Sequence, residues 1–170
     1  RTLHPAAVRP AGAADVAPKG GRQGKVVYPN ESTAAELPDG SLIFHTRDHN
    51  GPAPGNRGVA RSLDGGESFV QPFVPEPGIV GPICQGALLS GITAAGKPIL
   101  IASLPGDPAK RQNLLIRLSE DGGKTWVRGP LLHAGPAAYS DLAMLAPGQF
   151  LVLAELDGYQ RVALIPFTLP

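Results

Sequence analysis

Only a few segments of the chain carry side chains that could do chemistry together. They supply two carboxylates, two guanidinium groups and one phenol, namely Glu31, Glu155, Arg47, Arg111 and Tyr139. A planar guanidinium can bind a carboxylate through two parallel hydrogen bonds, and it stays charged at any working pH. A phenol has an ordinary pKa of about 10, so it needs a neighbouring base before it can act as a nucleophile. The sequence segments around these side chains decide which chemical role each of them can have.

Other patterns with chemical potential fail on spacing or number. The glycine-rich run 20–26 resembles a phosphate-binding loop, but its spacing is wrong and Val26 stands where a magnesium-binding hydroxyl belongs. His45 and His49 are four residues apart and have no obvious third ligand, so a metal site is not predicted. Cys84 is the single cysteine, which excludes an intrachain disulfide, and we interpret it as a small buried apolar residue.

The composition favours short strands joined by tight turns. Of 170 residues, 22 are Gly and 19 are Pro, which is well above average usage. The 15 basic and 14 acidic side chains nearly balance, so binding to nucleic acid through bulk positive charge is not expected. No apolar run approaches the roughly 18 residues of a membrane helix. Residues 1–12 also lack the apolar stretch of a signal peptide.

Short apolar runs separated by Gly, Pro, Asp or Asn predict strands along most of the chain, and no segment carries a long apolar stripe of helical period. We expect residues 1–23 to form a loop or poorly ordered segment and residues 24–170 to form one domain. The predicted strands are Lys25–Tyr28, Ser32–Leu37, Ser41–Arg47, Gly58–Leu63, Ser68–Val74, Gln85–Ile92, Pro98–Leu104, Asn113–Ser119, Thr125–Leu132, Tyr139–Leu145, Gln149–Leu156 and Arg161–Thr168.

An eight-residue motif occurs twice, at 62–69 and at 119–126, with the pattern S-x-D-x-G-x-[ST]-aromatic. The aspartate can accept backbone N–H bonds across a turn, the glycine permits a positive φ, and the aromatic residue can anchor the turn in the core. We therefore predict a structural role for the residues that define the motif, which are Asp64, Phe69, Asp121 and Trp126.

The two copies are 57 residues apart, which corresponds to about four strands, the size of one blade of a β-propeller. Ser32–Val74 and Gln85–Leu132 each provide four strands, whereas Tyr139–Thr168 provides three. A closed propeller needs roughly four to eight blades. The fold class is therefore predicted as all-β, a partial propeller of about three blades, which is part of a larger ring or closes with another chain.

The repeats resemble the Asp boxes of sialidases, a family of six-bladed propeller glycosidases, and four further segments match in the same order. Residues 30–48 resemble the segment in which a catalytic glutamate precedes a strand that ends in a carboxylate-binding arginine. Residues 84–86 resemble the Cys-Gln-Gly stretch of an inner strand, and residues 111–119 lead into the second box from another arginine of the family's triad. Residues 138–142 match the segment of the nucleophilic tyrosine.

The resemblance implies hydrolysis of terminal α-sialosides with retention of configuration. Tyr139 would be the nucleophile and Glu31 its base, Arg47 and Arg111 would hold the substrate carboxylate, and Glu155 would steady a further arginine. A neutral tyrosine suits this substrate, because an anionic nucleophile would be repelled by the carboxylate on the anomeric carbon. The scheme needs no metal or organic cofactor. The expected partner is a glycan that carries sialic acid or a related acidic sugar, and the family suggests a secreted or periplasmic location.

Two parts of the family pattern have no counterpart in the chain, which are the acid/base aspartate and the first arginine of the triad. Arg1, Arg9 and Arg22 lie in Ala/Pro/Gly-rich sequence without the strand context that this arginine requires. The chain therefore resembles the later half of a sialidase catalytic domain, and we expect the chain alone to be incomplete as an enzyme. The missing N-terminal half or a second copy would close the ring. The alternative function is a non-catalytic Asp-box module that binds glycan or protein.

Overall fold

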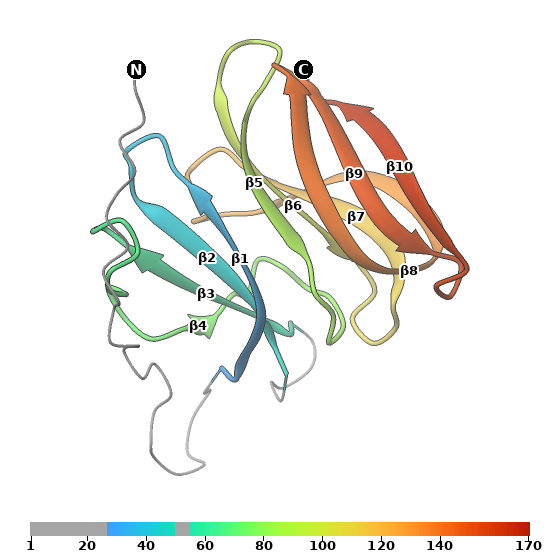
Figure 1. Cartoon of the computed structure of the whole chain (residues 1–170), viewed down its shortest axis with the longest axis horizontal. Coiled ribbons are helices and arrows are strands. Elements are labelled where there is room, and N and C mark those ends of the chain that lie inside the picture. The colour runs from blue at the N-terminus through green and yellow to red at the C-terminus, as the bar shows by residue number, and fades with distance from the viewer. Residues whose placement is uncertain (1–26, 50–54) are drawn as a thin grey trace.

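The computed structural model describes residues 27–49 and 55–170, and these form ten strands and no helix, so none that could cross a membrane (Figure 1). The prediction for residues 1–23 lies outside the described residues. The strands are β1 (Pro29–Glu36), β2 (Leu42–Asp48), β3 (Arg57–Ser62), β4 (Val74–Pro75), β5 (Ala87–Ile92), β6 (Pro98–Pro105), β7 (Gln112–Ser119), β8 (Val127–Ala146), β9 (Gln149–Leu156) and β10 (Arg161–Thr168).

The strands follow one another as antiparallel neighbours, which is the connectivity of propeller blades. The first sheet has the order β1-β2-β3-β4, and the second has the order β10-β9-β8-β7-β6-β5. Within the second sheet, β8 pairs with β7 through its first part and with β9 through its second part. The described residues thus form two four-stranded blades and three strands of a third, and the all-β partial propeller expected from the sequence is confirmed (Figure 1).

Three strand predictions were wrong in detail. Thr125–Leu132 and Tyr139–Leu145 belong to the single 20-residue strand β8, because register shifts let it bend and change partner without a turn. Ser68–Val74 shrinks to the two residues of β4, since the backbone N–H of Ser68 donates to the Asp64 carboxylate and Pro72 has no N–H to give to a ladder. The strand predicted at Lys25–Tyr28 lies partly outside the described residues, and Val27 and Tyr28 precede β1.

Two apolar clusters hold the blades together. One lies between the second and third blades and includes Phe150 and Ile116, both fully buried. The other lies between the first and second blades and includes Ile43 from β2 and Leu100 from β6. The second cluster sets β1 against β5. As a result, the strands that carry Glu31 and Arg47 face the strand that carries Tyr139.

Both Asp boxes fold as tight turns organised by their carboxylates. Asp121 accepts hydrogen bonds from the Ser119 hydroxyl at 2.8 Å, the Thr125 N–H at 2.9 Å and the Thr125 hydroxyl at 2.6 Å. Asp64 makes the same three bonds with Ser62 and Ser68. Gly123 has a φ of +84°, and a Cβ at this position would lie 2.6 Å from Ile43, so only glycine fits.

The aromatic residue of each box packs inward. Phe69 meets the Phe44 ring edge-on, with ring centroids 5.0 Å apart. Trp126 packs against the cluster between the first two blades. Trp126 therefore connects its turn to a buried cluster, and Phe69 connects its turn to the half-buried ring of Phe44.

We predict that Asp121→Ala lowers the midpoint of thermal unfolding by roughly 3–8 °C, because the buried Ser119 hydroxyl and the exposed donors of Thr125 lose their acceptor. Glu120→Ala is the matched control, since Glu120 is the exposed neighbour and should leave the midpoint unchanged. Circular dichroism of the two variants measures the difference. Equal midpoints would contradict a structural role for the box.

Candidate active site

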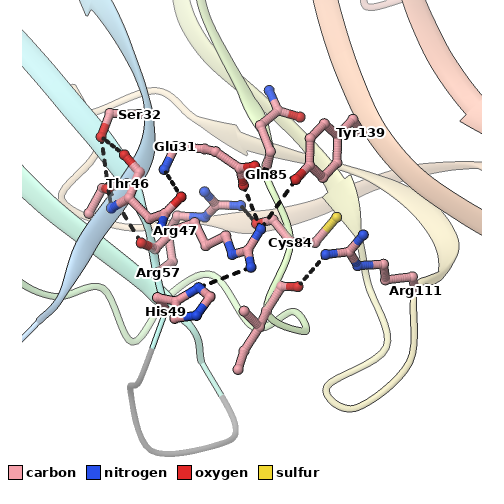
Figure 2. Close-up of polar contacts among 12 residues, drawn as sticks. Glu31, Ser32, Thr46, Arg47, His49, Arg57, Cys84, Gln85, Arg111 and Tyr139 are labelled. Atoms are coloured by element: carbon pink, nitrogen blue, oxygen red, sulfur yellow. Dashed lines mark hydrogen bonds and ion pairs between the residues drawn. The ribbon is translucent and has the colours of Figure 1, made fainter.

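Glu31 and Tyr139 meet in the structure although 108 residues separate them in sequence. The Tyr139 hydroxyl donates a hydrogen bond to Oε1 of Glu31 (Figure 2). Glu31 lies where the pairing of β1 with β2 shifts register between Pro29 and Ser32, and Tyr139 lies in a similar shift of β8 between Ala137 and Ser140. Such irregularities re-aim side chains that a regular strand would point elsewhere. The pair therefore depends on two bulges in strands of different blades.

Arg47, near the end of β2, contacts both members of the pair. Its Nη1 donates to Oε2 of Glu31 at 2.7 Å and to the Tyr139 hydroxyl at 3.2 Å. Its Nη2 lies 3.1 Å from Nδ1 of His49, which accepts the bond because a guanidinium has no acceptor. The Arg47 side chain is only 12% exposed. One guanidinium thus binds the carboxylate and the phenol at once.

Arg111 approaches Tyr139 from the opposite side (Figure 2). It precedes β7, and its Cζ lies 5.5 Å from the centroid of the Tyr139 ring. Its Nη1 donates to the hydroxyl of Tyr159 at 2.6 Å, and its Nη2 donates to the carbonyl of Ile83 at 3.0 Å. The two predicted arginines therefore flank the phenol, Arg47 at the hydroxyl and Arg111 over the ring.

The backbone around Tyr139 is held by residues of β9 and β6 and by Gln85, which precedes β5. Glu155 on β9 accepts a bond from the Tyr139 N–H at 3.2 Å. The amide of Gln85 binds the next residue, Ser140, at both its N–H and its carbonyl, each at 3.0 Å, and the Ser103 and Ser140 hydroxyls are 2.8 Å apart. Within the described residues Glu155 is bonded to this backbone and to no arginine. No role was predicted for Gln85, and its place in the Cys-Gln-Gly stretch is the only sequence signal that points to it.

Arg57 on β3 is a site residue that the sequence analysis missed. It is 3% exposed, its Nη2 donates to the Cys84 carbonyl at 3.1 Å, and its Nη1 has no partner among the described residues. A Cβ at Gly86 would lie 2.6 Å from this Nη2, so a glycine is required there. Burial lowers the pKa of Arg57 to about 10, which still leaves it charged at neutral pH. No local motif distinguishes Arg57 from a surface arginine.

The pKa values of the central pair move in opposite directions. Burial alone would raise the pKa of Glu31, but the hydrogen bonds from Tyr139 and Arg47 outweigh it, and the pKa is lowered. The hydrogen bond to Glu31 and burial raise the pKa of Tyr139, despite the two nearby arginines. At neutral pH the proton therefore belongs to the phenol and the negative charge to the carboxylate. This is the protonation state that a phenol nucleophile beside a carboxylate base would have before reaction.

An open groove of about 600 Å³ is bordered by Tyr139. It is lined by Tyr139, Gln85 and Glu155 on the polar side and by Leu153 and Val162 on the apolar side. The described residues contain no group of His, Cys, Asp or Glu that could hold a metal ion. The guanidinium of Arg111 lies over the phenol ring that borders the groove, and Glu31, Arg47 and Arg111 are not among the residues that line it.

Comparison with known proteins agrees with this fold. The profile of the BNR repeat-like domain family matches residues 20–152, so the chain belongs to that family. Its relatives within the family are of the sialidase type. The chain is 29% identical over 130 residues to a sialidase of Micromonospora viridifaciens, an alignment that covers 74% of this chain and 20% of that protein. It is 32% identical over 160 residues to a sialidase of Vibrio cholerae serotype O1, with 85% and 20% covered.

A solved sialidase structure has a similar fold. The Hadza microbial sialidase Hz136 superposes with a TM-score of 0.72 at 25% identity, over 82% of this chain and 27% of that one. The chain therefore spans about a fifth of the length of the curated relatives it matches and about a quarter of this structure. It is a sialidase-type BNR propeller domain by family and fold.

We predict that Glu31→Gln lowers the pKa of Tyr139. The charged carboxylate favours the protonated phenol, and its removal also frees the Arg47 cation to favour the phenolate. NMR of the chain labelled at the tyrosine Cζ measures the change, with Tyr139→Phe to assign the resonance. Glu36→Gln, the same change on the exposed end of β1, serves as the control. An unchanged or raised Tyr139 pKa would contradict the described pairing.

Proposed function

We propose that this chain is the tyrosine-bearing part of a sialidase-like exo-glycosidase that hydrolyses terminal α-sialosides with retention. The observation that carries the proposal is the contact of one phenol, one carboxylate and one guanidinium at Tyr139, Glu31 and Arg47. A structural tyrosine has no need of a half-buried ion pair at its hydroxyl. The sialidase relatives support the substrate class.

The first step would be attack by the Tyr139 oxygen on the anomeric carbon. The new bond joins the phenol oxygen to that carbon, the glycosidic C–O bond breaks, the phenol proton passes to Glu31, and the departing oxygen takes a proton from solvent or from a general acid on another blade. Water then attacks the same carbon and gives one proton to solvent or to the conjugate base of that acid, Glu31 returns its proton to the phenol oxygen, and the sugar is released with its original configuration. Arg47 stabilises the phenolate as its charge develops, since its Nη1 already contacts the hydroxyl. The scheme uses no metal or organic cofactor.

The substrate carboxylate would bind between Arg47 and Arg111. Each guanidinium has five N–H donors and uses only some of them in the described contacts, so each keeps donors for a carboxylate. Arg57 adds a third, buried positive charge close to Glu31 and Arg47. This excess of positive charge is unfavourable by itself and is relieved by an anionic ligand. An acidic sugar therefore fits the site better than a neutral one.

We also propose that other blades cover the third blade in the working protein, either from the same polypeptide or from a second copy. Its outer face exposes four large apolar side chains, which are Leu145, Leu153, Val162 and Leu164. An uncovered apolar face and an open edge strand favour association. Such blades could also supply the general acid, because no described aspartate is bonded to Glu31, Arg47, Arg111 or Tyr139.

We predict that the 170-residue chain alone works about 10³–10⁶-fold more slowly than a complete sialidase. General acid catalysis contributes about 10²–10⁴-fold. A further charge-assisted bond to the carboxylate contributes roughly 1.5–3 kcal/mol, or about another ten- to hundredfold. The assay uses an aryl sialoside with a good leaving group, which needs little help from an acid. Residual turnover should disappear in Tyr139→Phe and persist in Tyr28→Phe, a control 44% exposed and outside the site.

Three other outcomes are informative. Turnover of a natural glycan at the rate of a complete enzyme would contradict the predicted deficit. Residual turnover that survives in Tyr139→Phe would contradict the assignment of the nucleophile. Binding of N-acetylneuraminic acid without any turnover, even of the aryl sialoside, would favour the non-catalytic Asp-box module.

A further inference from the structure

Tyr159 is an exposed aromatic residue that the proposed reaction does not use. It lies in the turn between β9 and β10, and 61% of it is open to solvent. Its hydroxyl nevertheless has a protein partner, since it accepts the 2.6 Å bond from Nη1 of Arg111. The two residues are 48 positions apart and come from different blades. An exposed tyrosine with a merely solvated role would have no reason to make such a bond.

The backbone of this turn is held in a rare conformation. Tyr159 has a φ of +69°, and it follows Asp157 at +56° and Gly158 at +68°. The left-handed region is unusual for a bulky side chain, and it persists only where the surroundings impose it. An outlier of this kind bonded to an arginine beside Tyr139 is a reason to look for function in the residue that adopts it.

The surroundings that impose it belong to neighbouring strands. The Asp157 carboxylate accepts a bond from Nε of Arg161 at 2.9 Å and lies 3.2 Å from Nε2 of His133 on β8. The Asp157 N–H donates to the carbonyl of Pro136 at 2.8 Å. The turn is therefore tied to β8 on one side and to the start of β10 on the other. These ties hold the Tyr159 ring beside Arg111.

The guanidinium of Arg111 makes two hydrogen bonds to the protein, and the Tyr159 hydroxyl accepts one of them. The Ile83 carbonyl, 3.0 Å from Nη2, accepts the other. Two of the five N–H donors are used in this way, which leaves three. A free arginine side chain loses considerable rotamer entropy when it binds a ligand. Ordering it beforehand removes part of that cost from the binding step.

We propose that Tyr159 is a positioning residue that holds the Arg111 guanidinium over the Tyr139 ring, ready to receive a carboxylate. The identity of that carboxylate as a sialic acid rests on the proposed function. The positioning itself rests only on the contacts of Tyr159, Arg111 and Tyr139. The two parts can therefore be tested separately.

The first test is a double-mutant cycle on the dissociation constant of N-acetylneuraminic acid, measured by NMR titration of the full chain. Tyr159→Phe removes only the hydroxyl and should weaken binding about 5- to 20-fold. In the Arg111→Ala background the same change should have no further effect, because the residue acts through Arg111. Tyr28→Phe is the matched control and should bind as the parent chain does. Equal weakening in both backgrounds, or none in the parent, would overturn the proposal.

The second test needs no ligand and uses the pKa of Tyr139. The Arg111 cation lowers this pKa, so Arg111→Ala should raise it. Tyr159→Phe should raise it in the same direction by releasing the guanidinium, and the double variant should match Arg111→Ala alone. If the parent chain does not bind N-acetylneuraminic acid, the proposed function fails while this cycle still decides the role of Tyr159. An unchanged Tyr139 pKa in Tyr159→Phe would overturn the positioning role.

Discussion

One continuous strand fixes the geometry on which the site depends. β8 runs for 20 residues and belongs to two blades, since its first part pairs with β7 and its second part with β9. Blades that share a backbone cannot rotate independently. The cluster around Phe150, which is fully buried and stacks on Phe167 at 5.4 Å, fills the space between them. Tyr139 lies at the register shift of this strand, so its position follows from the bend that joins the blades.

The site forms where this shared strand faces the first blade. The apolar cluster with Ile43 and Leu100 presses β1 and β2 against β5 and β6, and this packing brings Glu31 and Arg47 to Tyr139. Packing supplies the proximity, whereas hydrogen bonds supply the orientation. Polar contacts at Gln85 and Glu155 hold the Tyr139 backbone without touching its hydroxyl. The phenol is thus aimed by residues that leave its oxygen free for Glu31, Arg47 and a ligand.

Charge is distributed unevenly in this arrangement. Glu31 is the one described carboxylate bonded to the Tyr139 hydroxyl, and three arginines surround it or the ring. Arg57 has no anionic partner within hydrogen-bond distance, and its burial lowers its pKa to about 10. A site with an unsatisfied buried cation is costly for stability and is expected where an anion binds. The electrostatics therefore agree with the acidic ligand that the proposed function assigns.

The sequence alone determined the features that depend on local physics. Alternating apolar runs and turn residues predicted most strands, and the Asp boxes predicted their own turns, because Asp64 and Asp121 bond only to residues within four positions. The short segments around Glu31, Arg47, Arg111 and Tyr139 carried enough of the family pattern for these residues to be selected together. Their meeting could be anticipated only through that resemblance, since nothing local links residues 31 and 139.

Tertiary structure decided what depends on contacts between distant segments. The fusion of two predicted strands into β8 required register shifts that no local pattern marks. Arg57 and Tyr159 were missed because one is defined by burial beneath Cys84 and the other by a hydroxyl placed against Arg111 by a left-handed turn. The bond of Glu155 to the backbone of Tyr139 was not predicted either, since the resemblance assigned Glu155 only to an arginine that has no counterpart in the chain. Local propensity acts along the chain, whereas burial, charge pairing and hydrogen-bond partners are set only when the blades pack.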